Sequence, residues 1–199
     1  CKYFMPRVLG PFCAEYPGID ISMEVINRDR LLERLSRNED DLYVMGIPPE
    51  AWDIESEPLV ENPLVVVAPA SHPLAGRRRI PFARLGKEVF LVRERGSGTR
   101  IAMENAFAER GVPLTVKMEL GSNEAIKQAV AGGLGLAVLS VSTLHFDTGL
   151  DDLVMLDVQG FPLKRFWYVV RPRGKQLSVV AHTFLEFLRE HVNLFEPKM

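Results

Sequence analysis

Residues 115–139 have the sequence TVKMELGSNEAIKQAVAGGLGLAVL and contain one complete strand–helix–strand unit. Residues 115–120 have strand character, and a Gly-Ser-Asn turn follows them. A helix is predicted over residues 123–131, with Ile126, Ala129 and Val130 on its apolar face, and Gly132-Gly133 ends it. The apolar run 134–139 is typical of a buried strand. This stretch therefore predicts an α/β fold.

The same alternation extends outward in both directions. Short loops join the elements, and this arrangement predicts an α/β fold with a mainly parallel sheet. Further helices are predicted at residues 3–16, from about 29 (capped by Asn27 or Asp29), at about 99–110 and at 178–192. Further strands are predicted at residues 19–25, 42–47, 64–70, 88–93, 153–158 and 165–170.

Two segments, 68–75 and 171–174, have the composition of connections between lobes. We therefore expect one lobe to comprise residues 1–70 and 171–199, and the second to comprise residues 71–170. Two crossings between two α/β lobes would leave a cleft between them.

Composition narrows the class of protein. The chain has 199 residues and a net charge of −2, with 47% hydrophobic and 25% charged residues. These values are typical of a globular protein and exclude a disordered chain or a coiled-coil rod. They also argue against a free-standing nucleic-acid binder, and the apolar runs are too short for a membrane span. Two cysteines, Cys1 and Cys13, without a signal peptide pattern, favour a cytoplasmic location.

No catalytic motif is present in the sequence. The chain has no G-x-S-x-G, Walker or H-E-x-x-H motif, its four histidines lack metal-ligand spacing, and no acid/base pair of carboxylates stands out. Gly96-Ser97-Gly98 begins like a dinucleotide-binding loop, but Ile101 stands where the third glycine of that motif would be. We therefore expect neither enzyme activity nor a cofactor nor a metal.

Two Gly/Ser turns that open helices are the best binding candidates. Ser97, Gly98, Thr99 and Arg100 form the first turn, and Ser122-Asn123 belongs to the second. Helix N-termini present free N–H groups and favour an anion, and Arg100 adds a forked donor. The simpler alternative is that the hydroxyls only cap the helices, and both interpretations remain open.

The chain as a whole resembles the effector-binding domain of LysR-type transcriptional regulators, and among them the regulators of Calvin-cycle (RuBisCO) operons. The motifs that carry the family resemblance are Tyr3-Phe4-Met5-Pro6, Phe12, Tyr16-Pro17, residues 31–35, Asp41-Leu42, residues 72–75 and residues 129–135. The stretches most similar to the RuBisCO regulators are residues 2–4, 38–46, 96–100 and 121–130.

The resemblance implies a periplasmic-binding-protein-like fold of type 2, in which two Rossmann-like lobes are joined by two crossover strands and an effector binds in the cleft. It implies homodimers or tetramers that bind DNA only through an N-terminal winged helix-turn-helix, which is absent from this chain. For the subfamily it implies a small anionic effector of the sugar-phosphate or NADPH class. A periplasmic solute-binding protein for a small anion is the alternative that shares the fold.

The resemblance and the two turns together yield a set of expected effector contacts. The second lobe is expected to bind through its two helix-opening turns, and the first lobe through Lys2 and the end of a strand. The full set is Lys2, Met45, Gly46, Ile47, Ser97, Gly98, Thr99, Arg100, Ser122 and Asn123.

Overall fold

The structure is a computed structural model that describes residues 2–145 and 152–191. The chain divides into two compact units. The first comprises Cys1–Asn62 and Arg165–Met199, and the second comprises Pro63–Lys164. Cys1 itself lies outside the described residues.

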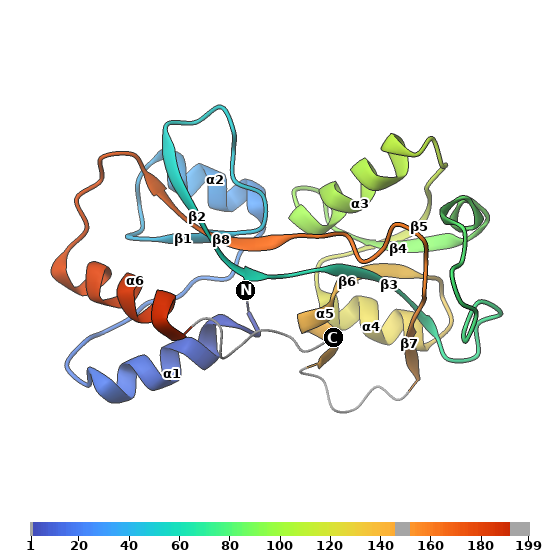
Figure 1. Ribbon diagram of the computed structural model, residues 1–199, viewed down its shortest axis with the longest axis horizontal. Coiled ribbons are helices and arrows are strands. Elements are labelled where there is room, and N and C mark those ends of the chain that lie inside the picture. The colour runs from blue at the N-terminus through green and yellow to red at the C-terminus, as the bar shows by residue number, and fades with distance from the viewer. Residues whose placement is uncertain (1, 146–151, 192–199) are drawn as a thin grey trace. The chain divides into compact units, whose positions relative to one another are not determined.

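A three-stranded antiparallel sheet forms the centre of the first unit. Its strand order is β1 (Tyr43–Met45), β8 (Phe166–Pro172) and β2 (Ile54–Glu61). Helices α1 (Met5–Glu15) and α6 (Val179–His191) run side by side below this sheet in Figure 1. The ring of Phe12 lies 5.0 Å from that of Phe184 and 5.2 Å from that of Phe187, which joins the two helices through edge-to-face packing.

Helix α2 (Arg28–Ser36) covers the other side of the sheet of the first unit (Figure 1). Asn27 caps it, because its side chain accepts a hydrogen bond from the backbone N–H of Arg30 at 3.1 Å. Leu35 of α2 is buried with Tyr43 and Met45 of β1. The predicted cap and apolar face of this helix are therefore confirmed.

The second unit is built on β3 (Leu64–Pro69), every residue of which is buried. It pairs antiparallel with β6 (Ala137–Ser140) and β7 (Leu153–Met155). Strands β4 (Val89–Arg93) and β5 (Thr115–Leu120) pair in parallel. A 3₁₀ helix, η1 (Phe82–Lys87), and a short helix, α5 (Val141–His145), complete the unit with α3 (Gly98–Glu109) and α4 (Asn123–Ala131).

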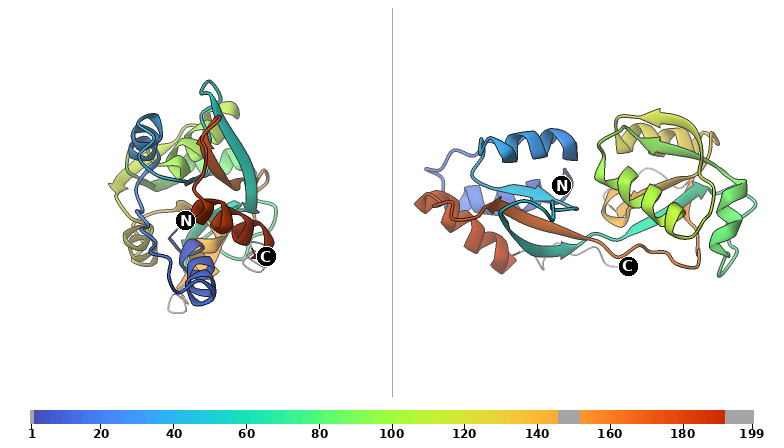
Figure 2. Two further views of the ribbon diagram at one scale, coloured as in Figure 1. Left: turned by 90° about the vertical axis from the view of Figure 1, so that its left-hand side faces the viewer. Right: turned by 90° about the horizontal axis from the view of Figure 1, so that it is seen from above.

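Helices α3 and α4 cover opposite faces of the strands of the second unit (Figure 2). Leu64, Val66 and Ala68 of β3 pack in the core cluster that includes α3, whereas Val65 and Val67 pack in the cluster that includes α4. Side chains alternate between the faces of a strand, so β3 is buried on both sides, as its uninterrupted apolar run predicts.

Gly135 allows β4 to approach the start of β6. A Cβ atom on Gly135 would lie 2.8 Å from the carbonyl oxygen of Val89, closer than side chains tolerate. Across this junction, the backbone N–H of Leu91 donates to the carbonyl oxygen of Leu136 at 2.8 Å. The N–H of Leu136 donates to the carbonyl oxygen of Val89 at 2.9 Å. The glycine is therefore required for the continuity of the strands.

The prediction of a mainly parallel sheet is wrong for the pairs in the described part of the chain, where only β4 and β5 form a parallel ladder. The unit boundaries also differ from the expected 70/71 and 170/171. Strand β3 belongs to the second unit because its partners β6 and β7 lie there, and β8 belongs to the first because it pairs with β1 and β2.

Two elements differ from the sequence prediction. Residues 19–25 are not a strand, although Ile21, Met23 and Val25 alternate as expected, and these three side chains are 38%, 40% and 50% exposed. A strand needs a ladder partner, and no ladder of the described residues includes this segment. Strand β2 was not predicted, because Glu55, Glu57 and Pro58 obscure its alternation.

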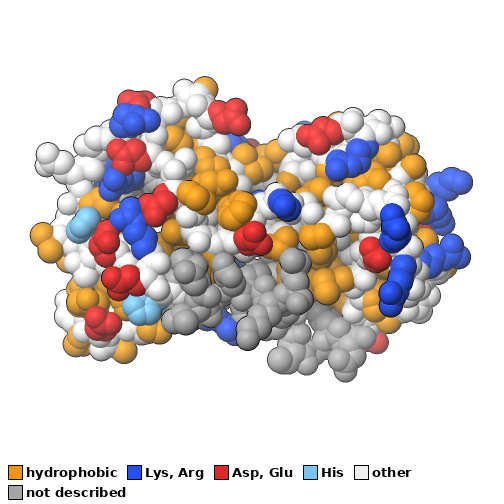
Figure 3. All heavy atoms as spheres, in the orientation of Figure 1, with side chains coloured by type: hydrophobic (Ala, Val, Ile, Leu, Met, Phe, Trp, Pro, Cys, Tyr) orange, Lys and Arg blue, Asp and Glu red, His pale blue; other side chains and the backbone are white. Residues whose placement is uncertain are grey.

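Charged side chains of both signs lie intermixed on the face of the chain that Figure 3 shows. In the first unit, Arg171 pairs with Glu55 at 2.5 Å and Arg189 pairs with Glu57 at 2.6 Å. Within the described residues, no helix has the length and apolar character that crossing a membrane requires.

Candidate functional site

The two Gly/Ser turns of the second unit lie at the starts of α3 and α4, as the sequence predicts. Each follows a strand, β4 or β5, and these two strands are parallel neighbours. Parallel neighbours end at the same edge of a sheet, so both helices start at that edge. Their N-termini therefore present backbone N–H groups and positive dipole ends to the same side.

Arg93, which sequence reasoning missed, links the two turns. Its Nη1 donates to Oδ1 of Asn123 at 2.8 Å, and its carbonyl oxygen accepts from Nη1 of Arg100 at 3.1 Å. Its Nε and Nη2 bond to the carboxylate of Glu94, at 2.7 and 2.8 Å. Asn123 and Arg100, one from each turn, are thus both tied to the last residue of β4.

Ser97 and Ser122 hold equivalent positions but differ in what their hydroxyls do. The hydroxyl of Ser122 accepts a hydrogen bond from the N–H of Ala125 at 3.1 Å and caps α4. Ser97 is the N-cap residue of α3, yet its side chain makes no capping hydrogen bond, and the residue is only 4% exposed. Capping therefore explains Ser122, and it does not explain Ser97.

Arg100 lies between two carboxylates. Its Nε bonds to Glu104 at 2.7 Å, and its Nη1 contacts Glu119 of β5. Glu104 and Glu119 together raise the pKa of Arg100, and Arg100 lowers the pKa of Glu119. The positive charge of Arg100 is largely balanced, so we expect it to contribute less to anion binding than its position in the sequence suggests.

Asn123 also has a contact toward the interior of the second unit. Its Nδ2 lies 3.4 Å from Oγ1 of Thr143, and the buried Lys127 donates from Nζ to the carbonyl oxygen of Thr143 at 3.3 Å. Lys127 lies among the buried residues of α4, next to Ile126, and a lysine within an apolar face is a signal for such a contact that the sequence does display. These contacts orient the Asn123 amide.

In the first unit, the predicted residues differ in their environments. Met45 is 2% exposed, and its side chain packs in the core of the first unit. The carbonyl oxygen of Ile47 accepts from Nε of Arg28 at 2.9 Å. Lys2 lies before α1, with Nζ 5.7 Å from the centre of the Tyr3 ring.

Gly46 lies against Arg165, a second residue that the sequence analysis missed. A Cβ atom on Gly46 would lie 2.5 Å from Cζ of Arg165, and closer still to Nη2 and Nε. No local pattern signals this contact, because the two residues are far apart in the chain and meet only through the pairing of β1 with β8.

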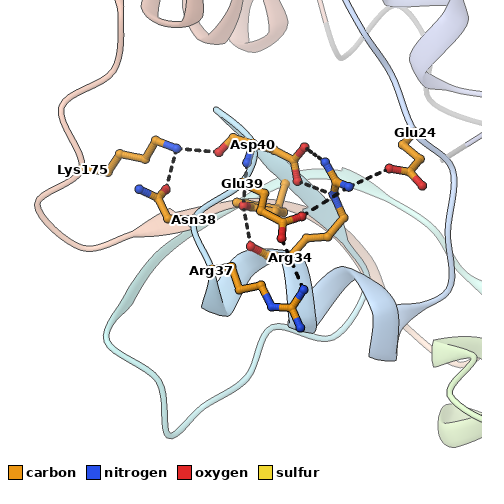
Figure 4. Close-up of polar contacts among 8 residues, drawn as sticks. Glu24, Arg34, Arg37, Asn38, Glu39, Asp40 and Lys175 are labelled. Atoms are coloured by element: carbon orange, nitrogen blue, oxygen red, sulfur yellow. Dashed lines mark hydrogen bonds and ion pairs between the residues drawn. The ribbon is translucent and has the colours of Figure 1, made fainter.

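A polar network holds α2 to the start of β1 (Figure 4). Arg34 makes two hydrogen bonds to the Asp40 carboxylate, at 2.9 and 2.5 Å, and pairs with Glu24 and Glu39. The hydroxyl of Tyr43 donates to the carbonyl oxygen of Arg34 at 3.0 Å. The Arg34 guanidinium lowers the pKa of Asp40. The network fixes the strand that leads to Gly46.

No group of three or more potential ligands that could hold a metal ion occurs within the described ranges. The chemistry of the second-unit turns is that of anion recognition: backbone N–H groups, a buried hydroxyl and amide donors. Nothing in that group of side chains forms a nucleophile–base pair.

The model of the LysR substrate-binding domain matches residues 1–193. The chain belongs to this family. Its similarity extends to two curated regulators. The HTH-type transcriptional activator CmpR of Synechocystis is 50% identical over 190 residues, which are 96% of this chain and 62% of CmpR. The RuBisCO operon transcriptional regulator of Acidithiobacillus ferrooxidans is 51% identical over 187 residues, 94% of this chain and 60% of that protein.

A solved structure supports the same fold for this LysR domain. The regulatory domain of Synechocystis CcmR in complex with 2-PG has a TM-score of 0.93 and 50% identity, covering 96% of this chain and 92% of that one. The periplasmic-binding-protein-like α/β fold and the resemblance to carbon-fixation regulators are thereby confirmed. The chain spans only about 60% of the length of the curated regulators.

Proposed function

We propose that this LysR domain is the effector-sensing part of a regulator of carbon-fixation genes and binds a small phosphorylated metabolite. The observation that carries the proposal is the 50% identity, over 96% of the chain, to a regulatory domain solved with 2-PG. The starts of α3 and α4 supply what a phosphate requires, which is several N–H donors and a positive dipole end.

Within this proposal, the second-unit residues bind the phosphate. The backbone N–H groups of Gly98 and Thr99 and the hydroxyl of Ser97 act at α3, and the Asn123 amide acts at α4. Ser122 caps α4, and Arg100 contributes a partly balanced charge. In the first unit, Gly46 and Ile47 contribute through their backbone, and Lys2 through its ammonium group.

Signalling requires that the effector bind two states of the regulator with different affinity. We propose that the whole protein is a homo-oligomer in the cytoplasm, that it contacts DNA through a helix-turn-helix domain outside this chain, and that effector binding changes how the copies pair. The names of the curated relatives, an HTH-type activator and an operon regulator, support this assignment. The same relatives support a role without enzyme activity.

Isothermal titration calorimetry tests the proposal. The protein is titrated with 2-phosphoglycolate, ribulose bisphosphate, phosphoenolpyruvate and NADPH, and glycolate and inorganic phosphate serve as matched controls for each half of the first ligand. We expect saturable binding of a phosphorylated metabolite and a weaker response to both controls. A folded protein that binds none of the four compounds contradicts the proposal.

A further inference from the structure

A short turn of the second unit, between β3 and η1, carries three consecutive arginines, Arg77, Arg78 and Arg79, and all three are exposed. The stretch of residues 70–88 around them contains five Lys and Arg residues and a single carboxylate. Lys and Arg side chains gather at the right-hand edge of the second unit in Figure 3. We call residues 77–79 the arginine turn. Positive charge is concentrated there, although the whole chain has a net charge of −2.

The carboxylates beside the arginine turn have other partners. Glu88 pairs with Nη1 of Arg84 at 2.7 Å and lies 3.5 Å from Nε2 of His72. The Asp157 carboxylate accepts a hydrogen bond from the backbone N–H of Arg79 at 3.0 Å, not from its guanidinium. Within the part of the chain that the structure describes, none of the three guanidinium groups forms an ion pair. Their charge is therefore available to a partner outside the chain.

The backbone of the arginine turn is fixed. Leu74 before the turn and Ile80 after it are both buried in the core of the second unit. Arg79 has a φ of 50°, a left-handed conformation that residues other than glycine rarely adopt. Nε of Arg77 donates to the carbonyl oxygen of Pro73 at 3.1 Å, which orients that side chain. Less conformational freedom is lost when charges held in this way bind a partner.

We propose that the arginine turn binds the phosphate backbone of DNA and adds to the contact of the helix-turn-helix domain in the whole regulator. The forked donors of arginine match phosphate oxygens, and contacts to phosphates need no particular base sequence. This inference rests on the proposed function, because that function is what brings DNA close to the domain. The expectation from the sequence places all DNA contact in the helix-turn-helix domain, so the arginine turn is a second contact.

The net charge of the chain limits the strength of this contact. A chain with a net charge of −2 repels DNA at long range, so the arginine turn binds DNA weakly by itself. Once another domain of the same protein holds the DNA nearby, the effective concentration of phosphate is high, and a weak contact adds to the total affinity. DNA is favoured over an acidic protein surface because a regulator of genes meets DNA phosphates whenever it acts.

Fluorescence anisotropy with a labelled DNA duplex of arbitrary sequence tests the inference on this chain. About three phosphate contacts predict an affinity that falls about 40-fold between 50 and 200 mM salt. The triple variant Arg77→Gln, Arg78→Gln, Arg79→Gln should bind at least about tenfold more weakly at 50 mM salt and should lose most of this salt dependence. A wild-type protein that binds no DNA at 50 mM salt, up to about 1 mM protein, overturns the proposal.

A second triple variant is the matched control, because it removes the same charge from the first unit. It carries Arg171→Gln, Arg173→Gln and Arg189→Gln, and each of these arginines is paired with a carboxylate. We expect its affinity for DNA to stay within about threefold of wild type. Equal losses in the two triple variants would show an effect of net charge alone and would overturn the assignment to the arginine turn.

Folding of each variant is monitored by circular dichroism and thermal unfolding. If the first triple variant does not fold, Arg78→Gln decides the question, because the Arg78 side chain makes no hydrogen bond within the described ranges. We expect this single change to weaken binding about threefold and to reduce the slope of log affinity against log salt concentration by about one. An unchanged slope would contradict a phosphate contact of Arg78.

Two further titrations separate the partner and the proposed function. Polyglutamate with the same charge as the duplex should bind more weakly than DNA, and equal or tighter binding would replace DNA with an acidic protein surface and overturn the proposal. Calorimetry with 2-phosphoglycolate should give the same affinity for wild type and the first triple variant. Binding of DNA without binding of any phosphorylated metabolite contradicts the proposed effector and leaves the arginine turn standing, and the reverse result overturns the arginine turn alone.

Discussion

At the level of single residues, Gly135 and Gly46 each have a neighbour too close to leave room for a Cβ atom, but the two neighbours differ in kind. Gly135 lies against the carbonyl oxygen of Val89, which is backbone and cannot move aside, whereas Gly46 lies against the end of a flexible arginine. Substitution at Gly135 must therefore shift a strand, and substitution at Gly46 needs to shift only a side chain. One glycine serves stability, and the other leaves room for the Arg165 guanidinium.

We predict that Gly135→Ala lowers the free energy of unfolding by about 1–3 kcal/mol because the added methyl group overpacks the junction of β4 and β6. Gly18→Ala is the control, since Gly18 is exposed and nothing lies within 4 Å of a Cβ atom there. It should change that free energy by less than about 0.5 kcal/mol. Urea denaturation measures both changes, and equal effects of the two variants would contradict the prediction.

The Arg34–Asp40 pair gives the first unit a pH dependence. Arg34 lowers the pKa of Asp40 in the folded state, so the pair stabilises the fold above the ordinary aspartate pKa, and this contribution is lost as the pH falls through the lowered value. We predict that Asp40→Asn costs about 0.5–1 kcal/mol at pH 7 and progressively less in acid. Denaturation at pH 7 and pH 3 measures this.

Asp41→Asn is the matched control for that prediction, because Asp41 is the exposed neighbour of Asp40. A cost of Asp40→Asn that is the same at both pH values would show that the pair does not contribute through its charges.

At the element scale, the starts of α3 and α4 appear equivalent in the sequence but differ in the structure. We predict that Ser122→Ala lowers the free energy of unfolding by about 1 kcal/mol, because it removes the cap of α4. Ser97→Ala should cost less stability, since Ser97 makes no capping bond, and should weaken binding of the phosphorylated metabolite. Denaturation and calorimetry on both variants give the comparison, and the reverse ranking would contradict it.

Local patterns made some elements predictable and left others hidden. The Gly-Ser-Asn turn and the apolar face of α4 are local, so the sequence predicts the strand–helix–strand unit around them. Strand β2 is defined by its register with β8, with Ile54 opposite Pro172, and a long-range pairing leaves little trace in a charged segment. Residues 19–25 show the reverse case: their alternating pattern predicts a strand, but no ladder of the described residues includes them.

The residues of the candidate site also divide into those that a local sequence pattern reveals and those that only long-range contacts bring in. The places of Ser97, Thr99, Ser122 and Asn123 at the helix starts were predictable because glycines and hydroxyls there form a local pattern. The bond from Arg93 to Asn123 spans 30 residues, and the contact of Arg165 with Gly46 spans more of the chain still. Such contacts arise from strand pairing, which the sequence does not display.

At the scale of the whole molecule, effector binding should stabilise the fold. A ligand that binds only the folded state adds about 2.7 kcal/mol at a concentration of 100 times Kd. We predict that 2-phosphoglycolate raises the Tm of the wild-type protein, and that glycolate at the same concentration and ionic strength does not. Differential scanning calorimetry measures both, and an equal shift with glycolate would contradict phosphate recognition.

A titration of the ¹⁵N-labelled protein with 2-phosphoglycolate, followed by NMR, tests whether a phosphorylated effector binds at the starts of α3 and α4. We expect saturable shifts of the backbone N–H signals of Gly98, Thr99 and Asn123, larger than those caused by inorganic phosphate. Saturable binding that leaves these signals unmoved, with shifts confined to other elements, would contradict it.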